Sequence, residues 1–203
     1  MYRFVLALWI VLLMAGTAWA GDTVKEEETG LAFKKELSGG LALIATGVRE
    51  KLGFDVYAAG AYVHKSYLPK LKEAKSPASK MIFGSFHRRL VLQFVRNAPA
   101  DKIQAAFRGN LEKHMTAEER PKAKDDIERF MRSMDPGIKK GQTFIFDAKG
   151  SRATVLLNGK KVFETENLIM LRTMWKVYFA SKNPISKTLY DNFVKGAASG
   201  PTP

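Results

Sequence analysis

The stretch LALIATGVREKLGFDVYAAGAYV, residues 41–63, decides the fold of this chain. Apolar residues alternate through it, and Gly47, Gly53 and Gly60 punctuate it. Strand-like segments need apolar residues on one face, and glycines within them mark bends or close approaches of the backbone. A single arginine, Arg49, stands between two such segments. It either reaches solvent or is held in the interior by an anionic partner, because an unpaired buried guanidinium is very costly.

The regions around this stretch predict a chain of strands interrupted by blocks of helices. Strands are expected where apolar residues alternate or β-branched and aromatic residues are dense, at 31–38, 41–45, 89–95, 142–148, 153–157 and 160–163. Helices are expected where apolar residues recur every three or four positions, at 67–75, 101–114, the segment after Thr116, 168–180 and 185–193. This order predicts an α+β domain, with a mainly antiparallel sheet and a layer of helices on one face.

Local signals place two of the connections. Asn158-Gly159 is a strong two-residue hairpin turn between the last two expected strands. Thr116 and Glu119 have the spacing of a capping box, in which each residue satisfies a backbone N–H of the other at the start of a helix.

The N-terminus has the pattern of a secretory signal peptide over residues 1–20. One basic residue, Arg3, precedes an apolar run, and Ala18-Trp19-Ala20 supplies the small-residue cleavage site. An uncleaved anchor is the alternative, but the run is shorter than the ~20 apolar residues that span a bilayer. We therefore expect a periplasmic or secreted protein, with a flexible lead-in over 21–30, one domain over 31–196 and a disordered tail over 197–203.

Composition limits the classes of function. The chain has no cysteine, so disulfides and thiolate chemistry are excluded. Its formal net charge is +13, but the basic residues are scattered in pairs at strand ends and turns, as Lys34-Lys35, Arg88-Arg89, Lys139-Lys140 and Lys160-Lys161. A nucleic-acid surface would concentrate them. A solvated basic surface is favoured, with weak association to an anionic membrane surface left open.

Motifs for metal, nucleotide and hydrolytic chemistry are missing from the sequence. His64, His87 and His114 have no carboxylate or second histidine at metal-ligand spacing, and Asp125-Asp126 lies in a charge-rich helix. We find no phosphate-binding glycine loop and no GxSxG elbow. We therefore expect neither a metal nor an organic cofactor.

Arg49 and Tyr57 remain as candidate ligand-binding residues. In one interpretation Arg49 points into an apolar cleft, where its forked donors hold a carboxylate or phenolate with help from the Tyr57 hydroxyl. In the other, Arg49 is an exposed turn residue and Tyr57 is buried with its hydroxyl at the rim. Composition alone favours the second interpretation.

The order of segments resembles the chalcone-isomerase-like family over nearly the whole chain after the signal. The resemblance begins at residues 41–63 and continues through RRLVLQFVRNAPADKIQAAF, IKKGQTFIFDAKGSRATVLLNGKKV and WKVYFASKNPISKTLYDNFVKG. It implies that Arg49 is the ligand-facing arginine and favours a bacterial periplasm. Tyr57 takes the place of the family's supporting threonine, and NAPADKIQ lacks the tyrosine expected after the central strand.

These departures from the catalytic pattern imply the fatty-acid-binding branch of the family rather than the isomerases. The leading hypothesis is thus an exported domain that binds a small amphipathic carboxylate or phenolate, such as a fatty acid, in an apolar cleft. A cofactor-free intramolecular lyase or isomerase of the chalcone-isomerase type is the first alternative. A non-catalytic structural or partner-binding module is the second.

Overall fold

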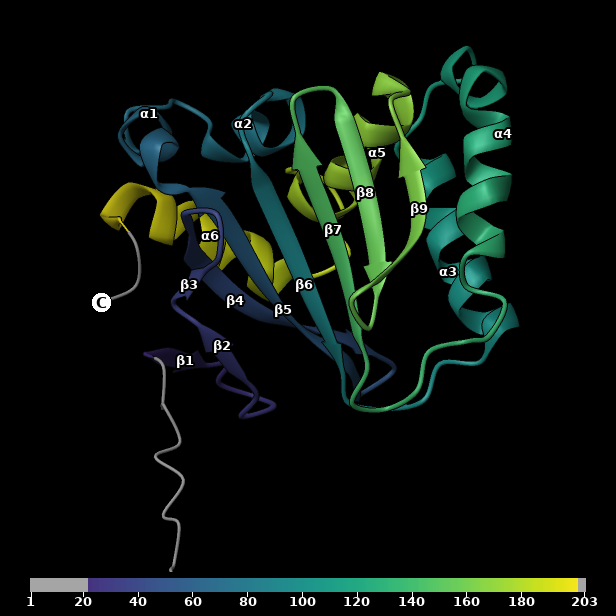
Figure 1. The fold of residues 1–203 in the computed structure, drawn as a ribbon, viewed down its shortest axis with the longest axis horizontal. Helices are drawn as coiled ribbons and strands as arrows, with labels where there is room; N and C mark the ends of the chain where they lie inside the picture. The colour runs from purple at the N-terminus through teal and green to yellow at the C-terminus, as the bar shows by residue number, and fades with distance from the viewer. Residues whose placement is uncertain (1–21, 201–203) are drawn as a thin grey trace, which may run out of the picture.

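The computed structural model describes residues 22–200, so the expected signal peptide lies outside the described residues. Its main sheet is antiparallel, with seven strands in the order β3-β4-β5-β6-β7-β8-β9 (Figure 1). The strands are β3 (Glu36–Leu37), β4 (Leu41–Lys51), β5 (Phe54–His64), β6 (Arg88–Phe94), β7 (Thr143–Lys149), β8 (Arg152–Leu157) and β9 (Lys160–Thr165). The expected central strand, 89–95, is β6, the middle strand of the seven.

The helices confirm the expected α+β class. They are η1 (Lys65–Tyr67), α1 (Leu68–Lys72), α2 (Pro77–Phe83), α3 (Ala100–Lys113), α4 (Glu119–Arg132), α5 (Leu168–Phe179) and α6 (Lys187–Ser199). Helices α5 and α6 lie behind the sheet in Figure 1, and α3 and α4 lie beyond β9. A second, two-stranded sheet of β1 (Thr23–Lys25) and β2 (Ala32–Lys34) covers part of the opposite face, where Phe33, Leu41, Leu43, Ala58 and Tyr62 form a small core.

Helix α6 packs directly on the backbone of β4. A Cβ added at Gly47 would lie 2.3 Å from the backbone nitrogen of Leu189, and one at Gly196 would lie 2.3 Å from the carbonyl oxygen of Ile44. Only glycine permits such close approach. Because α6 covers one face of β4 and the β1–β2 pair covers the other, β4 is buried along most of its length.

Aromatic side chains join α3 and α4 to the sheet. Phe107 of α3 and Phe130 of α4 have ring centroids 5.5 Å apart, and both contact Phe144 and Phe146 of β7. Phe130 also meets Phe163 of β9 at 5.3 Å. The apolar stripes predicted for the two helices therefore face one shared core.

Both local signals are confirmed. Asn158 and Gly159 have φ of 50° and 78°, as a two-residue turn of this type requires. The backbone N–H of Thr116 donates to Glu119 Oε2 at 2.9 Å, and that of Glu119 donates to Thr116 Oγ1 at 3.2 Å. Helix α4 begins at this capping box.

Three expectations differ from the structure. The expected flexible lead-in, 21–30, contains the strand β1, and Val24 of that strand packs on the small core. Glu26 in the same segment is buried, and its Oε2 accepts a hydrogen bond from the backbone N–H of Thr29 at 2.8 Å. Helix α6 continues to Ser199, into the expected tail, because Ala197 is buried. The expected helix at 67–75 is shorter, and a further helix, α2, begins at Pro77, where proline suits the first turn.

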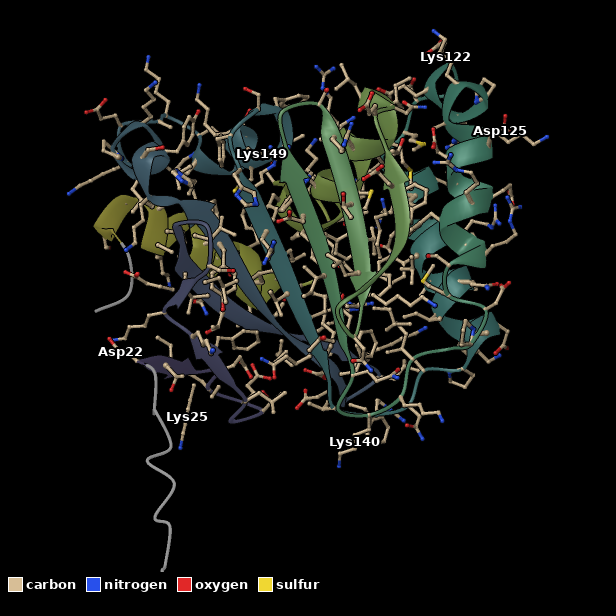
Figure 2. All side chains as sticks on the ribbon, in the orientation of Figure 1. Asp22, Lys25, Lys122, Asp125, Lys140 and Lys149 are labelled. Atoms are coloured by element: carbon tan, nitrogen blue, oxygen red, sulfur yellow. The ribbon has the colours of Figure 1, made fainter. Side chains whose placement is uncertain are left out.

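The basic side chains are spread over the surface. Lys25, Lys122, Lys140 and Lys149 lie on separate parts of the molecule in Figure 2. None of the helices within residues 22–200 has the length and apolar character needed to cross a membrane.

Candidate functional site

Arg49 and Tyr57 lie opposite each other on neighbouring strands. They are cross-strand partners in the β4–β5 ladder, so their side chains share the helix-covered face of the sheet. Arg49 is half-buried, and its Nη1 donates to the carbonyl oxygen of Ile185 at 2.8 Å. The fold therefore brings the two predicted residues together.

Ser186 fixes the segment that carries this carbonyl. Its Oγ donates to the carbonyl oxygen of Val48 at 2.5 Å and accepts from the backbone N–H of Leu189 at 3.2 Å, which caps α6. One buried serine thus ties the α5–α6 connection to β4 beside Arg49. The position of the Ile185 carbonyl follows from that attachment.

A second tyrosine completes the polar group. Tyr178 of α5 is buried, and its hydroxyl oxygen lies 3.4 Å from that of Tyr57. The sequence predicted Tyr178 only as part of the apolar helix 168–180, and its contact with Tyr57 was not foreseen. A tyrosine within a helix that is apolar on most faces could have indicated a polar contact in the interior, because a buried tyrosine hydroxyl usually has a hydrogen-bond partner.

Burial keeps both hydroxyls protonated. Desolvation raises the pKa of Tyr57 to about 12, although the hydrogen bond from Tyr178 and the positive charge of Arg49 act in the opposite direction. Desolvation and the neighbouring Tyr57 raise the pKa of Tyr178 well above its usual value, against the pull of Arg49. At neutral pH the two tyrosines are therefore neutral donors rather than bases.

Arg49 has no carboxylate partner among residues 22–200. Every ion pair in that part of the chain joins other residues. One of its N–H groups is satisfied by the Ile185 carbonyl, which carries only a partial charge. The site thus combines a full positive charge with two neutral hydroxyls.

An apolar hollow of 390 Å³ lies between the β4–β5 turn and the start of α3, and Arg49, Tyr57 and Tyr178 are not among the residues that line it. The β4–β5 ladder contains a β-bulge at Val56. Arg49 pairs with Tyr57 and Glu50 pairs with Asp55, so Val56 has no partner on β4. Val56 lines the hollow and packs on the same core as Tyr57. The other lining residues are Lys51, Leu52, Phe54, Arg96, Asn97, Ala98, Pro99, Lys102, Ile103 and Ala106.

The histidines are not grouped for metal binding. No set of three or more potential metal ligands is present within residues 22–200. His87 does have a carboxylate neighbour that sequence spacing could not reveal, because its Nε2 lies 3.0 Å from Asp147 Oδ1 across the β6–β7 pair. Arg89 shares that carboxylate oxygen at 2.8 Å.

Comparisons with known proteins agree with this architecture. A family model described as chalcone isomerase-like matches residues 30–193. Among solved structures, a fatty-acid binding protein of Arabidopsis thaliana is similar, with a TM-score of 0.72 and 21% sequence identity. The alignment covers 87% of this chain and 98% of that one. A search of curated protein sequences gives no significant match.

Proposed function

The chain belongs to the chalcone isomerase-like family, and on that basis we propose that it binds an amphipathic organic anion such as a fatty acid. Arg49 holds the acid group in this proposal, and Tyr57 and Tyr178 donate hydrogen bonds to it. The observation that carries the proposal is a guanidinium with no carboxylate partner in residues 22–200, whose positive charge acts on two buried hydroxyls. The similar plant protein is itself a fatty-acid binder by name.

The charges and donors suit a carboxylate head group. A guanidinium holds a carboxylate through two parallel N–H groups, and such charge-assisted bonds are about twice as strong as neutral ones. Because the tyrosines stay protonated, each offers a donor and adds no competing negative charge.

The apolar hollow suits the tail of such a ligand. Its 390 Å³ falls in the lower part of the range of ligand pockets, roughly 300–1,000 Å³. An acyl chain gains ~0.8 kcal/mol for each buried CH₂, so even part of a long tail contributes substantially.

Calorimetric titration with dodecanoate tests the proposal. Arg49→Ala is expected to weaken binding by ~1.5–3 kcal/mol, the usual contribution of hydrogen bonds to a charged group. Arg49→Lys recovers only part of the affinity, because an ammonium lacks the planar fork. Arg152→Ala is the matched control, since Arg152 is exposed and pairs with Glu166.

Two results would favour the alternatives. Equal affinity in wild type and Arg49→Ala would place the ligand elsewhere and favour a structural or partner-binding module. A saturable rate of chalcone cyclisation that disappears in Arg49→Ala would instead favour the isomerase hypothesis. We expect cyclisation at the buffer rate, because Tyr57 replaces the supporting threonine of the catalytic pattern.

We also propose that the β4–β5 turn, residues 51–54, contacts anionic lipid. Leu52 and Phe54 are 87% and 62% exposed, the highest values among the large apolar residues that the structure describes. Lys51, Arg96 and Lys102 line the hollow beside them, and no acidic residue does. Glu50 and Asp55 pair across the hairpin next to the turn, so the cations lie on the side of the hollow. Exposed apolar side chains beside three cations match the chemistry of an anionic membrane surface.

A further inference from the structure

Arg88, the first residue of β6, is a second arginine that lacks a carboxylate. The basic pair Arg88-Arg89 was expected on the solvated surface, but Arg88 is 0% exposed. Alternate residues of β6 point to one face, and Leu90, Leu92 and Phe94 belong to the main core. Arg88 is on the same face, so its guanidinium enters the interior.

Aromatic rings and backbone carbonyls surround this guanidinium. Its central carbon lies 4.8 Å from the centroid of the Trp175 ring and 5.4 Å from that of Phe86. Its Nη1 donates to the carbonyl oxygens of Gly84 and Phe86. Tyr67 stacks on Phe86 at 3.7 Å, and because both rings are half-buried, this stack extends from the guanidinium to the surface.

The charge of Arg88 is not compensated within residues 22–200. No ion pair there includes it. Burial lowers the pKa of Arg88 to about 10, against a small opposing influence of Tyr67, so the side chain still carries its charge at neutral pH. Carbonyl groups and aromatic faces offset part of the cost of a buried cation, but they supply no negative charge.

Two donors of Arg88 are also unused. Nε and Nη2 are buried and have no hydrogen-bond partner in the described part of the chain. A buried donor without a partner needs an explanation, which is often an ion or a water molecule. These two N–H groups lie along one edge of the guanidinium and point the same way, which is the fork that binds a carboxylate with two parallel hydrogen bonds. The bonds from Nη1 hold that edge in place.

We infer that the Nε–Nη2 edge of Arg88 is a carboxylate-binding site, separate from Arg49. The two arginines are at opposite ends of the same face, because Arg49 pairs with Tyr57 of β5 and Arg88 pairs with Val63. Six residues of strand separate Tyr57 from Val63, which is ~20 Å at about 3.3 Å per residue. The carboxylate is either a small free acid or the head group of a long-chain acid, and acetate and dodecanoate distinguish the two.

Thermal unfolding of the Arg49→Ala protein tests the Arg88 site. Because this variant lacks the Arg49 side chain, an effect of the acid there cannot come from the Arg49 site, and the two proposals are tested separately. Sodium acetate and dodecanoate serve as probes, with sodium chloride at equal ionic strength as the reference. We expect a saturable rise in the unfolding midpoint, by about 5 °C at a hundredfold excess over the dissociation constant. A rise with both acids indicates a small free carboxylate, and a rise with dodecanoate alone indicates a long-chain acid.

Substitutions then assign the effect to Arg88. Arg88→Met keeps an unbranched side chain of similar length but removes the fork, so the rise should disappear. Arg88→Lys keeps the charge but not the two parallel donors, so the acid should bind about tenfold more weakly. Arg152→Met, at an exposed arginine, should keep the full rise.

The wild-type protein gives a test that needs no folded Arg88 variant. In ¹⁵N-labelled protein, the Nε–H resonance of the buried Arg88 should move on addition of acetate or dodecanoate and stay unchanged with chloride. No midpoint rise with either acid, together with an unchanged Nε–H resonance, would overturn the inference. A rise that persists in Arg88→Met would overturn it as well.

Discussion

At the residue scale, Arg49 is anchored by the Ile185 carbonyl, and Tyr57 and Tyr178 contact each other. A carbonyl satisfies a hydrogen bond without neutralising the charge, so the attraction of Arg49 for an incoming anion is retained. The Tyr57–Tyr178 oxygen–oxygen distance of 3.4 Å is longer than the usual hydroxyl hydrogen bond of about 2.5–3.0 Å, so their contact is weak. Both hydroxyls can therefore turn to a ligand oxygen at little cost.

Removing either hydroxyl should weaken binding moderately. Tyr57→Phe and Tyr178→Phe each delete one neutral hydrogen bond, which is ~1 kcal/mol or about fivefold in affinity. Calorimetric titration with dodecanoate measures the loss. Tyr190→Phe, on α6, is the control and should bind normally. Full affinity for dodecanoate in both Tyr57→Phe and Tyr178→Phe would show that neither hydroxyl donates a hydrogen bond to the ligand.

The raised pKa of Tyr57 predicts a loss of stability at high pH. The folded-state pKa of about 12 lies above the ordinary value of about 10 in the unfolded chain. The folded state then holds its proton more tightly, so the contribution of Tyr57 is complete below pH 10 and falls as pH rises toward 12. Urea unfolding measures the free energy of unfolding of wild type and of Tyr57→Phe. The advantage of wild type over the variant should fall by ~1.4 kcal/mol per pH unit between pH 10 and pH 12. A pH-independent difference would contradict this burial effect.

At the scale of elements, the contact between α6 and β4 positions Arg49. Gly47 is two residues from Arg49, and the α6 backbone passes directly over it. Ser186, at the start of α6, also holds the helix to β4, because its hydroxyl donates to the carbonyl oxygen of Val48. A change in the separation of these two elements would move the Ile185 carbonyl away from the guanidinium.

Gly47→Ala should therefore destabilise the protein by roughly 1–3 kcal/mol, the usual cost of overpacking a core. The new Cβ would meet the backbone of Leu189 at 2.3–2.5 Å, which a flexible side chain cannot relieve. Gly109→Ala in α3 is the matched control, because no atom lies within 4 Å of its added Cβ. Alanine there should stabilise the helix by about 1 kcal/mol. Urea unfolding of both variants measures the contrast, and equal effects would contradict the packing argument.

At the scale of the whole molecule, the basic charge is dispersed while the most exposed apolar residues are concentrated. The positive side chains occupy separate parts of the surface, as Figure 2 shows. Among residues 22–200, the two most exposed large apolar side chains, Leu52 and Phe54, both lie at the β4–β5 turn and line a hollow that three cations also line. Leu52 also has a φ of 54°, an unusual conformation for a non-glycine residue. The turn therefore holds Leu52 outward at an energetic cost.

Vesicle flotation tests the proposed lipid contact of this turn. We expect wild type to float with vesicles that contain 30% phosphatidylglycerol at low salt, and not with phosphatidylcholine alone. Phe54→Ser should reduce the floated fraction severalfold. Phe83→Ser is the matched control, because Phe83 is 57% exposed and has a nearby arginine, Arg172, as Phe54 has Arg96. Equal loss in the two variants would contradict a site at the turn.

The sequence by itself determined the α+β class, the central strand, the Asn158-Gly159 turn and the capping box at Thr116. Each depends on periodicity or turn chemistry within a few residues, which local sterics and backbone hydrogen bonding decide. The pairing of Arg49 with Tyr57 was not among these features, because a regular hairpin would pair Arg49 with Val56 and the bulge at Val56 shifts the register by one residue. The class, the central strand, the turn and the capping box need no knowledge of distant segments.

Only the tertiary structure decided what surrounds the arginines. Tyr178 meets Tyr57 across 121 residues, and the Ile185 carbonyl meets Arg49 across 136. Arg88 illustrates the physical reason most directly. A basic pair at the end of a strand is compatible with solvent in sequence terms, yet the alternation of β6 directs Arg88 inward, where Trp175 of α5 covers it. The alternation is a local pattern and gives the direction of the side chain, but its complete burial depends on Trp175, which is far away along the chain.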